Sequence, residues 1–193
     1  RSTHCISSAA SDVYKRQKAT FAVLNKINSL RDTDENYVGA MKRNAAKTNF
    51  YFMAVAQSGA DRGAGLTNHS LLQVSCENLA FGYTDPAAGW NSEKASFNKI
   101  RDELGYSSIT SQSQLTAVEQ KADSEGVTVG HYTNMFWAAD QVMGVGFTLY
   151  GRYGNTSCFN ASKLSNYTSK YEVYTIAEFE KLFDEYYKSK QSE

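Results

Sequence analysis

The sequence predicts a single layered domain that combines α-helices and β-strands, of the α+β or α/β class. Three observations support this fold class. Amphipathic helical patterns fill the first part of the chain, strand patterns alternate with helices after it, and neither a repeat nor a linker divides it. The length is sufficient for one domain with a sizeable core.

The helices are predicted from apolar residues that recur at intervals of three and four positions. Phe21, Leu24 and Ile27 mark the first helix, while Pro86 and Gly105 suit the first turn and the end of the third. We expect helices over residues 18–31, 37–57, 86–104, 113–124 and 177–188. A loop is expected after the second helix, because residues 58–65 are rich in glycine.

The strands are predicted from short apolar runs that are bounded by turn residues. We expect strands over residues 78–83, 142–150, 157–161 and 171–174. Alternation along the first strand places Glu77, Leu79 and Phe81 on one face. A core-facing Glu77 needs a compensating hydrogen bond; the alternative is an exposed carboxylate at the end of the strand.

Glu93 is the second informative carboxylate. It follows Trp90 by three positions and precedes Phe97 by four, so a continuous helix places it beside the apolar stripe. A buried carboxylate requires a donor, a cation or a proton. The alternative is a residue at the rim of the core whose carboxylate reaches water.

The first seventeen residues are expected not to belong to the native protein. The run from Ser7 to Gln17 resembles the in-frame translation of a common transposase sequencing adapter. We therefore expect native sequence to begin at Lys18, any signal peptide to be missing, and the gene to derive from bacterial metagenomic reads. His4 and Cys5 are given no functional weight for the same reason.

Charge and hydropathy exclude some classes of partner. Setting aside Arg1, Lys15, Arg16 and Asp12 from the 20 basic and 20 acidic residues leaves 17 and 19, a net charge of about −2. No basic run or face stands out, so nucleic acid is not an expected partner. No apolar stretch approaches the length of a transmembrane segment.

Two cysteines, Cys76 and Cys158, lie outside the first seventeen residues. The count is compatible with one disulfide and equally with two buried thiols. A Cys76–Cys158 bridge would close most of the domain and stabilise it by roughly 4 kcal/mol in the chain-entropy model.

The remaining histidines are His69 and His131. His131 lies in an aromatic segment, where a hydrogen-bonded core role is common, and His69 lies in a polar segment that is compatible with a solvent loop. Their spacing alone does not define a metal site, because neither HExxH nor paired CxxC motifs occur. A serine-hydrolase GxSxG elbow is also absent from the sequence.

Three segments together resemble the CAP superfamily, the SCP-like group of cysteine-rich secretory, antigen 5 and pathogenesis-related proteins. The GHYTQ-x-x-W signature of that family is matched by Gly130-His131-Tyr132-Thr133-Asn134-Met135-Phe136-Trp137, with Asn134 for glutamine. Its ENLA motif is matched by Glu77-Asn78-Leu79-Ala80, and its W-x-x-E helix by Trp90 and Glu93. The resemblance covers roughly Lys18 to Ala161.

The resemblance implies a three-layer α-β-α sandwich with a central cleft. It also implies that His69, Glu77, Glu93 and His131 form a tetrad in that cleft, with the two histidines able to bind a divalent ion such as zinc. Imidazole suits Zn²⁺, and carboxylates behind the imidazoles would orient them. Two protein ligands alone imply a weakly held ion. An extracellular or cell-surface location is expected by the same resemblance.

The chain departs from the family in its cysteines and at its C-terminal end. Val145 stands where many members have cysteine, and Cys158-Phe159-Asn160 only faintly resembles a second family signature. These departures favour a bacterial, cysteine-poor relative. We therefore divide the chain into the adapter-like residues 1–17, a CAP-like domain over residues 18–165, and a strand and helix extension over residues 166–193.

Two functions are compatible with these features. In the first, the domain is a binding module, and its cleft holds a metal ion and a lipid, peptide or glycan. In the second, it is a metal-assisted hydrolase of peptidase type in which Glu77 or Glu93 is the general base. We expect binding rather than catalysis, because no nucleophile is identifiable. A third alternative is that the tetrad only closes the core.

Overall fold

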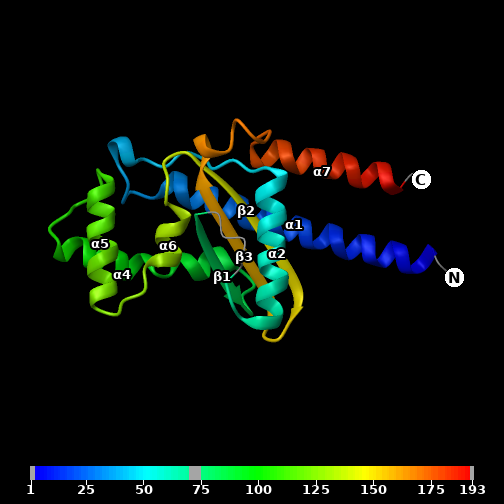
Figure 1. Ribbon diagram of the computed structural model, residues 1–193, viewed down its shortest axis with the longest axis horizontal. Coiled ribbons are helices and arrows are strands. Elements are labelled where there is room, and N and C mark those ends of the chain that lie inside the picture. Colours follow the sequence, from blue (N-terminus) through cyan, green and yellow to red (C-terminus); the bar gives the residue numbers. More distant parts are fainter. Residues whose placement is uncertain (1–2, 70–74, 192–193) are drawn as a thin grey trace.

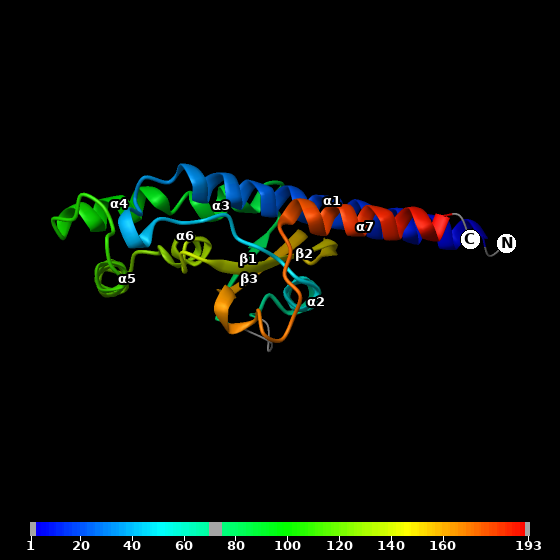
Figure 2. The ribbon, with the colours of Figure 1, turned by 90° about the horizontal axis from the view of Figure 1, so that it is seen from above.

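The computed structural model describes residues 3–69 and 75–191 as a three-layer α-β-α sandwich (Figures 1 and 2). The middle layer is an antiparallel sheet with the strand order β1-β3-β2. It is formed by β1 (Cys76–Phe81), β2 (Gln141–Gly151) and β3 (Gly154–Lys163). The predicted strands at 78–83, 142–150 and 157–161 therefore exist, and the α+β sandwich is confirmed.

One outer layer is the helix α2 (Phe50–Leu66), which packs across β2 and β3. The approach is close enough to bring backbone against backbone. A Cβ atom added at Gly144 would lie 2.1 Å from the Phe52 carbonyl oxygen, and one added at Gly146 would lie 2.2 Å from that of Ala56. Glycine at these two strand positions is therefore a condition of the helix–sheet contact.

The other outer layer contains α1 (Thr3–Thr33) and α3 (Pro86–Asn91), which lie on the opposite side of the sheet from α2 (Figure 2). Phe21, Leu24 and Ile27 of α1 are buried as predicted. At one end of the sheet, α4 (Lys94–Glu103), α5 (Gln112–Ser124) and α6 (Gly130–Met135) surround an aromatic core (Figure 1). Ring contacts in this core join Tyr37, Phe97, Tyr132 and Phe136.

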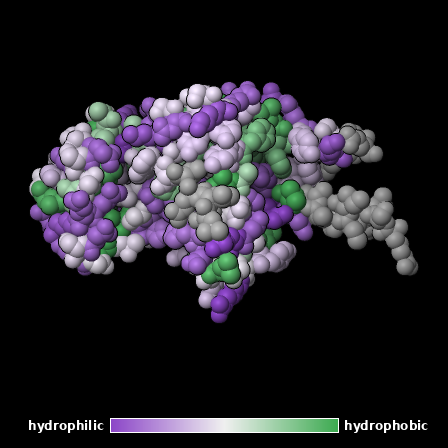
Figure 3. Space-filling model, viewed as in Figure 1, coloured by the Kyte–Doolittle hydropathy of each residue, from purple (hydrophilic) through white to green (hydrophobic). Residues whose placement is uncertain are grey.

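The predicted C-terminal helix is present as α7 (Ile176–Gln191), which lies alongside α1 and extends beyond the sandwich (Figures 1 and 2). Lys18 of α1 forms ion pairs with Glu180 and Asp184 of α7. Tyr14, which belongs to the adapter-like segment, stacks on Tyr187 with ring centroids 4.2 Å apart. In Figure 3 hydrophobic surface gathers near α7 and the start of α2, where Phe50 and Leu182 are exposed.

The predicted second helix over residues 37–57 is wrong in its first half. A short 3-10 turn covers Gly39–Met41, and the chain then runs extended to Asn49. Lys47 pairs with the start of β2, since its amide donates to the Gln141 carbonyl oxygen at 2.9 Å. The Asn49 side chain accepts from the Phe52 amide and caps the true helix start.

The loop expected over residues 58–65 is also wrong, because these residues continue α2. A Cβ atom at Gly59 would lie 2.4 Å from Cys158 Sγ, and one at Gly63 would lie 3.3 Å from the Thr156 methyl carbon. The glycines that indicated a loop serve helix–sheet packing instead.

Three smaller corrections concern the remaining elements. The predicted helix over residues 86–104 is two helices, α3 and α4, with Ser92 and Glu93 between them. The predicted strand over residues 171–174 is reduced to one backbone bridge between Thr48 and Tyr174. The helix α6 was not predicted. Within the residues described, no helix is both long and apolar enough to span a bilayer.

Candidate functional site

The structure pairs each of the two histidines with one of the two glutamates. His131 Nδ1 lies 2.7 Å from Glu93 Oε1, and His69 Nδ1 lies 2.8 Å from Glu77 Oε1. In both pairs the imidazole is the more exposed partner. The exposed fraction of the side chain is 39% for His131 against 15% for Glu93, and 57% for His69 against 1% for Glu77.

The break between α3 and α4 positions Glu93. Trp90 anchors α3 to the sheet, because its indole N–H donates to the Leu79 carbonyl oxygen at 3.2 Å. The chain then turns at Glu93, whose Oε2 accepts from the amides of His131 at 2.9 Å and Tyr132 at 3.1 Å. This carboxylate therefore satisfies two amides at the start of α6 while its other oxygen holds the imidazole.

The ring of Tyr132 fixes α6 from its other side. It is fully buried, and its hydroxyl donates to Asp34 Oδ2 at 2.8 Å and accepts from the Asn36 side chain at 2.8 Å. Burial and the neighbouring Asp34 raise the pKa of the Tyr132 hydroxyl, so it stays protonated as a donor. The adjacent His131 is therefore carried by a short helix that is anchored both by its amides and by a buried phenol.

Glu77 faces α2 together with Leu79 and Phe81, as strand alternation predicted. Its Oε2 accepts from the Asn160 amide at 3.1 Å and from the Cys158 thiol at 3.4 Å. The compensating donors that a buried carboxylate requires are therefore supplied by β3, the neighbouring strand. Burial, with the Glu77 carboxylate beside it, raises the pKa of the Cys158 thiol, so the thiol remains a donor.

Asparagines connect the elements that carry the two pairs. Asn78 of β1 donates to the His131 carbonyl oxygen at 2.7 Å. Asn134 of α6 donates to Asn78 Oδ1 at 2.8 Å and to the Glu77 carbonyl oxygen at 3.4 Å. The start of β1 and the helix α6 are thus tied together, with Asn134 bridging to the strand from the position where the family signature has glutamine.

From the sequence, Asn78 and Asn134 were identified only as parts of family motifs, and Asn160 was assigned no role. Asn78, Asn134 and Asn160 are all located where they support a histidine–glutamate pair. For Asn78 and Asn160, a polar amide within an otherwise apolar strand is the signal that could have found them, because a buried amide requires partners.

Each histidine–glutamate pair joins the carboxylate to Nδ1 of the ring, so the contact leaves the second ring nitrogen, Nε2, outside it. When Nδ1 donates its proton to a carboxylate, Nε2 keeps its lone pair and can bind a metal. The glutamates are engaged behind the histidines and are not free to act as further ligands. Over residues 3–69 and 75–191, no group of three or more histidine, cysteine, aspartate or glutamate side chains is arranged to hold a metal ion.

The disulfide between Cys76 and Cys158 is not formed, and both residues are buried free thiols. Cys158 faces α2, where it lies against Gly59. Cys76 lies on the opposite side of the sheet, where its thiol points to the Asn134 carbonyl oxygen at 3.8 Å. Side chains on opposite faces of a sheet cannot be bridged without moving the backbone. Burial raises the pKa of the Cys76 thiol to about 12.

The fold is similar to that of venom allergen-like protein 4 of Schistosoma mansoni. The two chains are 15% identical, and the similarity covers 75% of this chain and 90% of that one, with a TM-score of 0.45. No known protein-family profile matches the chain. No curated protein matches it either.

Proposed function

We propose that the chain is a CAP-type binding domain of the extracellular space or cell surface, which binds a divalent ion through His69 and His131. A small ligand or peptide would bind at the same centre. One observation carries the proposal: each imidazole is held at Nδ1 by a glutamate, which leaves its Nε2 available. Zinc is the ion that best suits two imidazoles, and water or the ligand would complete its coordination.

The geometry favours binding over hydrolysis. A general base must have an oxygen free to take a proton from water. The oxygens of Glu93 accept from one imidazole and two amides, and those of Glu77 accept from an imidazole, an amide and a thiol. Both carboxylates are therefore suited to orienting histidines, and neither is well placed for the hydrolase alternative.

Calorimetric titration with Zn²⁺ tests the proposal. All samples should carry His4→Ala, because His4 is the one other histidine of the sequence and could bind zinc itself. We expect binding in the parent protein and its loss in the double variant His69→Ala/His131→Ala. Equal heats in both proteins would refute the metal site. Loss of only half of the binding sites in each single variant would show two independent sites in place of one.

The glutamates provide a second, sharper comparison. Glu77→Gln and Glu93→Gln keep the shape of each side chain but replace one acceptor oxygen with a donor amide. An amide opposite Nδ1 favours the tautomer that carries its proton on Nε2, where the metal would bind. We expect each change to weaken zinc binding by about ten- to a hundredfold, as is usual for residues behind a ligating histidine. Unchanged affinity in folded variants would contradict the assigned role.

A further inference from the structure

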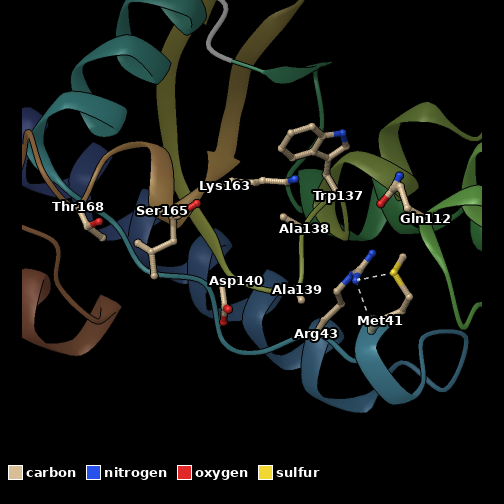
Figure 4. A pocket seen from close by; sticks show the side chains of 11 residues that line it. Met41, Arg43, Gln112, Trp137, Ala138, Ala139, Asp140, Lys163, Ser165 and Thr168 are labelled. Carbon is tan, nitrogen blue, oxygen red and sulfur yellow. Dashed lines mark hydrogen bonds between the residues drawn. The ribbon is translucent and has the colours of Figure 1, made fainter.

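A pocket of about 390 Å³ lies where the extended segment after α1 meets the loop between α6 and β2 (Figure 4). Its walls come from four parts of the chain: the segment with Arg43, the start of α5, the loop with Trp137, and the end of β3 with Lys163. None of the four tetrad residues lines it. The pocket is therefore separate from the two histidine–glutamate pairs.

Arg43 is the unusual residue of this pocket. It is only 3% exposed, and Figure 4 shows its guanidinium pointing toward the loop that holds Trp137 and Ala138. Nη1 donates to the Met41 carbonyl oxygen at 2.6 Å, and the guanidinium lies 4.3 Å from the centre of the Tyr37 ring. Its Nε and Nη2 have no hydrogen-bond partner in the part of the chain that the structure describes. Buried donors without an acceptor are costly, so an acceptor that reached these atoms would be favourable.

The surrounding charges are mostly positive. Arg31 lies behind the pocket wall, fully buried, and donates to the carbonyl oxygens of Ala138 and Ala139 at 2.9 Å each. Lys163 lies at the rim, with its ammonium 6.0 Å from the centre of the Trp137 ring. Asp140 is the one carboxylate lining the pocket, and its Oδ1 already accepts from Asn44 at 2.7 Å. The pocket lining therefore carries two cations against one engaged anion, and Arg31 adds positive charge behind the wall, which gives the pocket a positive potential.

The remaining lining groups include an aromatic ring and two hydroxyl groups. The Trp137 indole offers a flat apolar surface, and the hydroxyl groups of Ser165 and Thr168 offer weak donors. A guanidinium recognises carboxylate and phosphate oxygens especially well, because its donors match their geometry. The volume lies within the range of small-molecule sites and is too small for a folded partner.

We infer that this pocket binds a small organic anion, whose carboxylate or phosphate group meets Arg43 and Lys163 and whose apolar body packs on Trp137. Nε and Nη2 of Arg43 are buried from solvent, so the oxyanion would reach them by displacing part of the pocket wall and would then supply their acceptor. Binding at this pocket is separate from the metal site, so it does not depend on His69 or His131.

The test uses benzoate and phenyl phosphate as probes, with neutral benzyl alcohol as the control ligand. Chemical shifts of the Trp137 indole N–H, in ¹H–¹⁵N spectra of the full chain, report binding. We expect saturable shifts with at least one anion and none with the alcohol. The two anions distinguish carboxylate from phosphate recognition. Binding should also weaken as sodium chloride is raised, because the contacts are ionic.

Variants locate the binding. Arg43→Gln should weaken it by about tenfold or more, as expected for loss of charge-assisted hydrogen bonds, and Lys163→Met by somewhat less. Lys99→Met, an exposed lysine of α4, is the matched control and should leave the affinity unchanged. The double variant His69→Ala/His131→Ala should bind the anion normally. The inference is overturned if neither anion shifts Trp137, or if Lys163→Met and folded Arg43→Gln both bind as the parent does.

Discussion

The two histidine–glutamate pairs look alike in their contacts but are supported in different ways. Glu93 holds His131 and also the first amides of α6, so its carboxylate is part of the backbone scaffold. Glu77 holds His69 and is itself held by side chains of β3, Cys158 and Asn160. The first imidazole is carried on a helix, and the second lies in the segment beyond α2.

This difference separates two tasks that a buried carboxylate can perform. Near α6 the carboxylate contributes to the fold, because a helix start without acceptors is unfavourable. Beside α2 the carboxylate is almost fully buried, yet the imidazole it orients is mostly exposed. Its contribution should therefore appear more in the orientation of His69 than in the stability of α2. The following changes distinguish the two tasks.

The largest expected effect is that of Glu93→Ala. It removes the acceptor for the His131 and Tyr132 amides as well as the partner of the His131 ring, so we expect a loss of about 3 kcal/mol in the free energy of unfolding. Urea denaturation measures this loss. Glu103→Ala on α4 is the control, because its ion pairs are exposed and should contribute at most about 1 kcal/mol. A loss below that of the control would contradict the scaffold role of Glu93.

Gly59→Ala should have the next largest effect, on the side of the Glu77 pair. The added methyl group would lie 2.4 Å from Cys158 Sγ and 3.3 Å from Glu77 Oε2, so we expect a loss of about 2 kcal/mol from overpacking. Thermal unfolding is a suitable measurement. Gly65→Ala in the same helix meets no atom within 4 Å and should be neutral or stabilising.

The cause of the Gly59→Ala effect can be checked with a second change. Adding Cys158→Ala removes the sulfur atom that the new methyl group meets, so the double variant should lose less stability than the two separate losses predict. Strict additivity would show that the contact between Gly59 and Cys158 does not limit the approach of α2 to the sheet.

The smallest effects are expected from the histidines themselves. His131→Ala removes one partly buried hydrogen bond and should cost about 1 kcal/mol, while His69→Ala removes a largely exposed partner and should cost less than about 0.5 kcal/mol. Chemical denaturation of the two variants side by side gives this order. The reverse order would mean that His69, not His131, is the histidine built into the scaffold.

The sequence predicted the sandwich and singled out both carboxylates, but it did not predict the path of the chain before α2. Strand alternation correctly placed Glu77 toward the core. Glu93 was placed on one continuous helix, whereas it lies at the break between α3 and α4. The extended path before Asn49 was missed because it depends on pairing with β2, which is distant in sequence. Local patterns do not contain that information.

Glycine misled the prediction in a consistent way. Residues 58–65 were expected to form a loop from composition, although Gly59 and Gly63 lie where α2 touches the sheet. Glycine signals either a turn or a close approach, and only the packing partner decides between them. The possible disulfide was left open for a similar reason. The number of cysteines does not reveal that Cys76 and Cys158 face opposite sides of the sheet.

The tautomers of the two imidazoles test the account most directly, because the proposed metal site depends on Nε2 being unprotonated. Long-range ¹H–¹⁵N spectra of the neutral imidazoles report which nitrogen carries the proton. With His4→Ala as background, we expect His69 and His131 both to carry it on Nδ1, and zinc to shift both Nε2 resonances together. A proton on Nε2 in either residue, or zinc shifts confined to one of them, would contradict the account.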